Sequence, residues 1–146
     1  MATITASAET EIAASPETIW QIMTDAAQEG AWMRAVRSAE FIGGGGYAIG
    51  SRMRRSGRFL GFPLTWESEI SDVFPARRIV FRHVAGALRG ESHWEIEPVD
   101  GGSRVRLVTK GPAPGPLAWA PALATAMVRR GLEGDLARLK RLAEAA

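Results

Sequence analysis

Two ionisable side chains, His83 and Arg55, fall on strand faces that the sequence predicts to be apolar. The first is His83. Residues 77–84 follow an approximate period of two, which places His83 on one face with Ile79 and Phe81. Imidazole titrates near neutral pH. This position therefore predicts either an acid–base or ligand-binding group, or a strand-end histidine with satisfied hydrogen bonds. His93 falls with glutamates on the wet face of its own strand, so the two histidines predict no metal site.

The second such side chain is Arg55. If Met53 faces inward, Arg55 does too, because strand residues two apart share a face. A buried guanidinium without a partner is costly, so this reading requires a carboxylate, a ligand anion or water beside it. The alternative is a register slip or bulge near residues 54–57 that turns Arg55 outward. Both readings stay open, and His83 and Arg55 are the candidate catalytic residues.

Aromatic and small polar residues share the same predicted inner face. Trp66 and Trp94 would stack on a flat ligand or fill the core, and serine and threonine hydroxyls there are handles of the kind that orient ligands. No Asp or Glu falls clearly on this face, and no Ser–His–Asp arrangement can be argued, which disfavours a nucleophilic hydrolase. The predicted ligand-binding residues are Trp66, Trp94, Met53, Phe81, Ser68, Ser92, Thr109 and Met127.

A framework of strands and one long helix must position these residues. Strand-like alternation covers residues 3–12, 37–42, 51–59, 64–74, 77–84, 90–97 and 104–109. Ser15 followed by Pro16 predicts the start of a short helix, and Asp25 predicts a second one near Trp32. Residues 43–46 are four glycines that lead into another strand, so they predict a hairpin connection rather than a phosphate-binding loop.

The last third of the chain predicts a break and then a long amphipathic helix. Residues 111–116 (GPAPGP) have proline at every second position and should end the sheet, since proline has no backbone donor. The helix should begin at Leu117 or Ala122 and run to Ala143, with Met127 on its apolar stripe. Gly131 and Gly134 inside it predict close approach to a neighbour or a bend.

These elements predict an α+β fold formed by a single domain over residues 1–146. One helix cannot cover about seven strands unless the antiparallel sheet curves around it. The expected order is one strand, two short helices, six strands and the long C-terminal helix. Curling a sheet around one helix should leave an apolar, ligand-sized cavity at its wide end.

Composition narrows the classes of protein. The 146 residues are 46% hydrophobic and 23% charged, as in an ordinary globular protein. Neither a signal peptide nor a run of about 20 apolar residues is visible, and there is no cysteine, which predicts a cytoplasmic protein without membrane insertion. All basic residues except Lys110 and Lys140 are arginines, interleaved with acidic residues. That pattern favours a mixed-sign surface over nucleic-acid binding.

Several stretches together carry a family resemblance. They are residues 14–20 (ASPETIW), Trp32, residues 50–53 (GSRM), 75–81 (PARRIVF), 94–98 (WEIEP), 100–105 (DGGSRV) and 131–140 (GLEGDLARLK). With them the whole chain resembles the START-like superfamily, also called the SRPBCC or Bet v 1-like group, and within it the bacterial polyketide cyclase/dehydrase-like proteins. The resemblance implies a helix-grip fold with a hydrophobic pocket between sheet and helix.

Members of that superfamily bind lipids, sterols, polyketides, hormones or aromatic compounds, and a minority catalyse cyclisation or dehydration. The leading expectation is therefore binding of a small hydrophobic molecule, without a cofactor, by a monomer or homodimer. An alternative is a polyketide cyclase or dehydratase in which Arg55 stabilises an enolate and His83 moves a proton. A third is a protein-interaction module that presents the rim between helix and loops.

Overall fold

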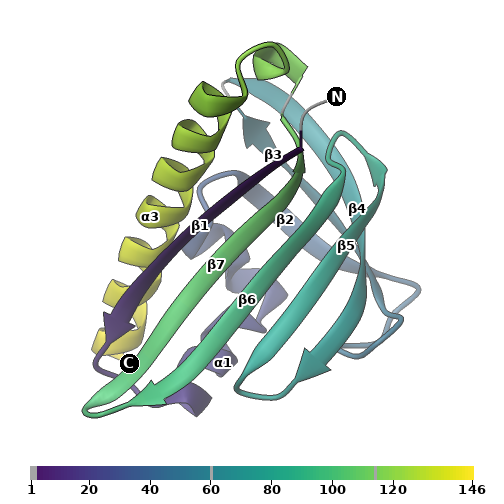
Figure 1. The fold of residues 1–146 in the computed structure, drawn as a ribbon. Helices are drawn as coiled ribbons and strands as arrows, with labels where there is room; N and C mark the ends of the chain where they lie inside the picture. Colours follow the sequence, from purple (N-terminus) through teal and green to yellow (C-terminus); the bar gives the residue numbers. More distant parts are fainter. Residues whose placement is uncertain (1–2, 60, 114) are drawn as a thin grey trace.

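Seven strands form one antiparallel sheet that curves around a long C-terminal helix (Figure 1). The computed structural model describes residues 3–59, 61–113 and 115–146. The strands are β1 (Thr3–Ile12), β2 (Val36–Ile42), β3 (Arg52–Phe59), β4 (Phe62–Phe74), β5 (Arg78–Gly86), β6 (Gly90–Val99) and β7 (Gly102–Pro112). Their spatial order is β1-β7-β6-β5-β4-β3-β2, so successive strands from β2 to β7 pair as neighbours and β1 joins β7. The predicted α+β helix-grip architecture is confirmed.

The short helices after β1 begin where the sequence predicts. The helices are α1 (Pro16–Met23), η1 (Ala26–Gln28), α2 (Glu29–Trp32), η2 (Gly115–Leu117) and α3 (Pro121–Ala145). The Ser15 hydroxyl accepts the backbone N–H of Thr18 at 3.1 Å, and the Asp25 carboxylate accepts that of Ala27 at 3.1 Å. Both predicted caps are therefore confirmed. No helix in the described part of the chain is long and apolar enough to cross a membrane.

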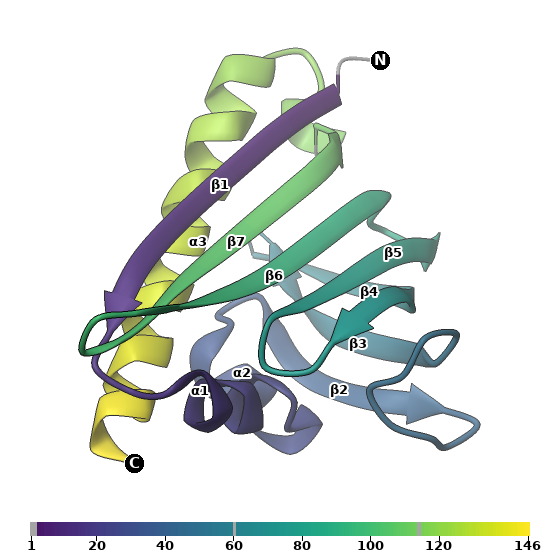
Figure 2. The ribbon, with the colours of Figure 1, turned by 60° about the horizontal axis from the view of Figure 1, so that its bottom comes forward.

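Irregular pairing in β4 bends the sheet. The register against β5 shifts between Glu67 and Ser68 and again between Ile70 and Asp72. Such bulges increase local twist and bend the strand that carries them. Figure 2 shows the curved sheet with β1 beside α3 at one edge and β2 near α2 at the other.

One local expectation from the sequence is wrong and another is narrowed. Strand β7 continues to Pro112, opposite Thr3, although residues 111–116 were expected to lie outside the sheet; proline at the last strand position removes little pairing. Pro114 of that segment lies outside the described residues. Of the two explanations for Gly131, close approach to a neighbouring element is excluded, because a Cβ placed there meets open space.

Polar contacts tie the C-terminal half of α3 to other elements. The Asp135 carboxylate accepts the backbone N–H of Arg34 at 3.1 Å, and Arg138 Nε donates to the carbonyl of Trp32 at 3.0 Å. Burial raises the pKa of Asp135. Further down the helix Lys140 Nζ donates to the carbonyl of Glu11, and the Glu144 carboxylate accepts the N–H of Ala13. These contacts fix α3 along β1 and against α2.

Apolar packing divides into two clusters. The main core lies between the sheet, α1, α2 and the C-terminal half of α3, and it includes Trp32, Phe81 and Trp94. A smaller cluster at the other end of the molecule joins the end of β3, η2 and the start of α3; its members are Ile4, Ala113, Leu117, Ala124, Phe59, Met127 and Val128. Met127 thus lies in the smaller cluster, apart from Phe81 and Trp94.

The outer face of the sheet carries cross-strand ion pairs. Arg104 contacts Glu97 at 2.8 Å and Glu11 at 3.0 Å, and Arg82 contacts Glu69 at 3.0 Å. These side chains are largely exposed, so each pair adds little stability. The mixed-sign surface predicted from the interleaved arginines is confirmed.

Gly57 is a position where no side chain fits. A Cβ there would overlap the backbone carbonyl of Ala35, the residue directly before β2, which lies alongside β3. We expect Gly57→Ala to lower the free energy of unfolding by more than about 2 kcal/mol. Gly131→Ala, in open space on a helix, should raise it by up to about 1 kcal/mol. Urea unfolding measures both, and a neutral Gly57→Ala variant would contradict the close approach.

Candidate functional site

The concave face of the sheet carries the predicted site residues. Trp66 and Ser68 of β4, Phe81 of β5 and Trp94 of β6 are buried there, as the alternation predicts. Cross-strand pairing sets Ser68 opposite His83 and Ser92 opposite Phe81. Thr109 on β7 lies opposite Ser92 and is half-buried. Small polar side chains therefore form a belt across β4 to β7.

Arg55 faces inward, which settles the alternative that the sequence left open. No bulge interrupts the pairing of β3 with β4, where Arg55 lies opposite Trp66. Its partner is a protein carboxylate: Nε lies 2.6 Å from Glu29 Oε2 and Nη2 lies 2.8 Å from Glu29 Oε1. The side chains of Arg55 and Glu29 are 3% and 0% exposed. This is a two-pronged, buried ion pair.

Glu29 was not among the residues that the sequence pattern singled out. It stands at the first position of α2, a four-residue helix, and only the fold carries it over the concave face. The sequence predicted no Asp or Glu on the inner face of the strands, and the buried carboxylate comes instead from a helix that covers that face. A glutamate at the start of a helix is normally explained by its favourable interaction with the helix dipole. Its position in the sequence therefore did not indicate that it is a buried counter-ion.

Aromatic rings surround the guanidinium. The Arg55 Cζ lies 4.5 Å from the ring centroid of Phe81 and 6.0 Å from that of Trp94. Phe81 and Trp94 meet edge to face at 4.6 Å, and Trp32 meets Trp94 at 5.1 Å. Cation–π contact adds to the ion pair in holding the charge inside.

His83 lies between two serines on the concave face. Its Nδ1 is 2.8 Å from Ser68 Oγ, and its Nε2 is 3.1 Å from Ser92 Oγ. Burial, with a smaller contribution from the Arg55 charge, lowers the pKa of His83 from 6.5 to about 4. The imidazole is therefore neutral at pH 7, with one nitrogen as donor and the other as acceptor.

Two further polar atoms on this side are buried without a hydrogen-bond partner among the described residues. They are the Tyr47 hydroxyl and the Trp32 Nε1. Burial and the negative charge of Glu29 raise the pKa of Tyr47, so its hydroxyl stays protonated. Buried donors are rarely left unpaired, so each is a point where a ligand or water would be stabilised. Tyr47 follows the glycine run, and no pattern in the sequence marked that position.

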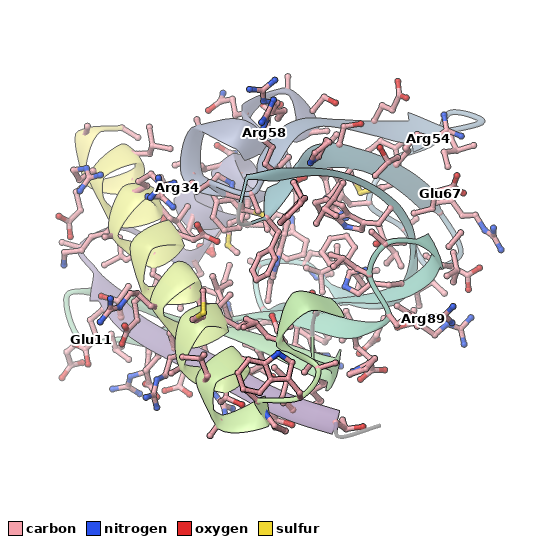
Figure 3. All side chains as sticks on the ribbon, turned by 90° about the horizontal axis from the view of Figure 1, so that it is seen from above. Glu11, Arg34, Arg54, Arg58, Glu67 and Arg89 are labelled. Carbon is pink, nitrogen blue, oxygen red and sulfur yellow. The ribbon has the colours of Figure 1, made fainter. Side chains whose placement is uncertain are left out.

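Two hollows stand out on the described surface, and both lie outside the concave face. One, of about 520 Å³, lies between α2 and the start of β2, and the other, of about 350 Å³, lies between α2 and the end of α3. Neither is lined by a predicted ligand-binding residue. Figure 3, seen from above, shows side chains of the sheet and of α3 pointing into the region between them.

The Glu29–Arg55 pair generates a first prediction for this site. We expect Glu29→Gln to lower the free energy of unfolding by about 3–5 kcal/mol, because it leaves a buried guanidinium without its counter-ion. Replacing both residues, Glu29→Leu with Arg55→Met, should recover a large part of that loss. The exposed pair Arg54–Glu67 provides the control, since Glu67→Gln should cost less than about 1 kcal/mol. Equal losses in the two variants would contradict this account.

The lowered pKa of His83 generates a pH prediction. Between pH 6.5 and 4 the unfolded chain binds a proton at this residue that the folded chain does not. The free energy of unfolding should therefore fall by up to about 1.4 kcal/mol per pH unit as the pH drops through this window. Urea unfolding at pH 7, 6 and 5 should show a shallower fall for His83→Gln than for the wild type.

Comparison with solved structures finds this architecture in other proteins. The protein TTHA0849 from Thermus thermophilus is 23% identical, with a TM-score of 0.79 over 97% of this chain and 98% of that one. Ara h 8.0201 is 16% identical, with a TM-score of 0.72 over 99% and 100%. The Aha1 dimer from Colwellia psychrerythraea is 20% identical, with a TM-score of 0.68 over 97% and 96%. At these identities the likeness concerns the fold alone.

Family comparison is more specific. No curated protein matches the chain. The family model described as polyketide cyclase / dehydrase and lipid transport matches residues 1–144, almost the whole sequence. The chain therefore belongs to the polyketide cyclase / dehydrase and lipid transport family.

Proposed function

We propose that the protein binds a small, uncharged, mainly apolar molecule on the concave face of its sheet, next to His83. The observation that carries this proposal is the chain of hydrogen bonds Ser68–His83–Ser92, which crosses three strands between the two apolar clusters. Membership of a family described by lipid transport supports binding of this general kind.

The number of polar hydrogens on Ser68, His83 and Ser92 supports a ligand that carries a hydrogen-bond acceptor. Two serine hydroxyls and one neutral imidazole bring three polar hydrogens, and the two hydrogen bonds use two of them. One hydroxyl donor is left over, on Ser92 or on Ser68 according to the tautomer of His83. Ser68 is fully buried, while Ser92 is partly accessible. Ser92 is therefore the better placed to donate to a ligand carbonyl or hydroxyl oxygen.

The charges of the concave face support an uncharged ligand. Glu29 and Arg55 neutralise each other, and His83 is neutral at pH 7. A ligand carboxylate would have to leave water without a counter-ion, and this costs several kcal/mol. A ketone, an alcohol or an amide on an apolar body meets no such cost.

The geometry gives less support to a cyclase or dehydratase based on His83 and Arg55. Two donor nitrogens of the Arg55 guanidinium are held by Glu29, which leaves it poorly placed to stabilise an enolate. An imidazole with a pKa of about 4 is also a weak base for abstracting a proton at neutral pH. Binding without chemistry accounts for both features.

A matched set of ligands tests the proposal. 2-Acetylnaphthalene and 2-naphthoate share one ring system and differ in charge at pH 7.5. We expect the ketone to bind, as measured by titration calorimetry, and the carboxylate to bind at least about 10-fold more weakly because its charge must be desolvated. Equal affinity for the two compounds would contradict an uncharged site.

Variants of single serines locate the site. Ser92→Ala removes the donor and should weaken binding of 2-acetylnaphthalene about 5-fold to 10-fold, the value of one hydrogen bond. Ser7→Ala, on the outer face of β1, is the control and should bind like the wild type. An unchanged affinity in Ser92→Ala would contradict a binding site at Ser68, His83 and Ser92, even if the protein bound the ketone elsewhere.

A further inference from the structure

Three stretches at one end of the molecule lack any charged residue. They are residues 59–64 from the end of β3 into β4, residues 84–88 from the end of β5 toward β6, and residues 111–128 from the end of β7 into α3, of which residues 60 and 114 lie outside the described part of the chain. We call these three stretches the uncharged rim. The opposite end is mixed: the link between β2 and β3 is uncharged, but the turn between β4 and β5 carries Arg77 and the turn between β6 and β7 carries Asp100.

Packing places the three stretches side by side. Phe59, at the end of β3, belongs to the small apolar cluster with Leu117 of η2 and Ala124 of α3. The carbonyl of Arg89 lies against Gly111, so the turn between β5 and β6 adjoins the end of β7. Figure 3 looks onto this end and shows Arg58 and Arg89 on its perimeter.

The uncharged rim exposes large apolar side chains to solvent. Trp119 is 80% exposed, Phe62 60%, Leu123 49% and Val84 36%. Among the described residues only Ile49 and Phe74 are comparable elsewhere. Exposed apolar groups gathered at one end of a protein mark a surface that meets another apolar phase.

Basic residues border every stretch of the rim. Arg58 precedes the first, Arg89 follows the second, Lys110 precedes the third, and Arg129 with Arg130 follows it. In the part of the chain that the structure describes, none of these five side chains forms an ion pair, unlike the arginines of the outer face such as Arg82 and Arg104. Glu91 lies near Lys110 and is hydrogen-bonded to His93. The positive charge around the rim is therefore available to an anionic partner.

We propose that the uncharged rim docks on the surface of an anionic lipid membrane, with Trp119 and Leu123 entering the headgroup region. Tryptophan and leucine beside flanking arginines are the composition that binds the membrane interface. Basic side chains near such a surface each add about 1 kcal/mol of attraction to anionic lipid. An acidic protein partner fits less well, because the rim offers few side-chain hydrogen bonds to a protein surface.

Vesicle binding tests this docking on the full chain. The probes are vesicles of phosphatidylcholine alone and of phosphatidylcholine with 30% phosphatidylglycerol, in 50 mM and 300 mM NaCl. We expect the protein to sediment with the anionic vesicles at low salt and to be released at high salt, because screening weakens the basic flank. Absence of binding to anionic vesicles at 50 mM NaCl would overturn the proposal.

Matched variants assign the binding to the rim. Trp119→Ala with Leu123→Ser should weaken binding about 10-fold or more, while Ile49→Ser with Phe74→Ser removes two equally exposed apolar groups elsewhere and should have little effect. Arg129→Gln with Arg130→Gln should weaken binding about 10-fold or more, and Arg77→Gln with Arg141→Gln is its control. Equal effects of a pair and its control would overturn the assignment to the rim.

Tryptophan fluorescence gives an independent readout. Trp119 is the most exposed tryptophan, so anionic vesicles should shift the emission to shorter wavelength, and Trp119→Phe should remove that shift. Hydrogen–deuterium exchange with vesicles and with soluble poly-glutamate separates the two kinds of partner. Protection of residues 115–128 by poly-glutamate and not by vesicles would overturn membrane docking and indicate that the partner of the rim is an acidic protein.

Discussion

The buried ion pair between Glu29 and Arg55 is the interaction on which the concave face depends. It joins α2 to the inner side of β3, so it holds the short helix that covers the core against the sheet. It also brings two charges into a region that would otherwise be apolar. Because they neutralise each other within hydrogen-bond distance, the interior contains strong local fields and no net charge.

Those fields add to the effect of burial on the neighbouring titratable groups. The positive end of the pair helps to keep His83 neutral, and the negative end helps to keep the Tyr47 hydroxyl protonated. Each charge of the pair acts in the same direction as burial, so neither His83 nor Tyr47 titrates near pH 7. A site built in this way is suited to recognising a molecule by hydrogen bonds. It is poorly suited to moving protons, which requires a pKa close to the working pH.

Sequence patterns were sufficient for the fold and for the direction of most inner side chains, including Trp66, Ser68 and Trp94. The partner of Arg55 could not be predicted, since Glu29 lies 26 residues away in a different element. Alternation predicts which face a strand residue occupies, but it carries no information on which helix later covers that face. Nor does it predict how much open space a curved sheet leaves, because that depends on the volumes of the side chains that meet across it.

The two ends of the molecule are built for different tasks. At one end polar contacts from Asp135, Arg138 and Glu144 fix α3 to α2 and β1. At the other end the start of α3 is held by a small cluster of apolar side chains around Phe59 and Leu117. Apolar contacts lack direction, and a cluster of this size separates at lower cost than the main core. On the two proposals above, an apolar molecule would enter toward the concave face at this end, and it would do so with least exposure to water where the rim docks on lipid.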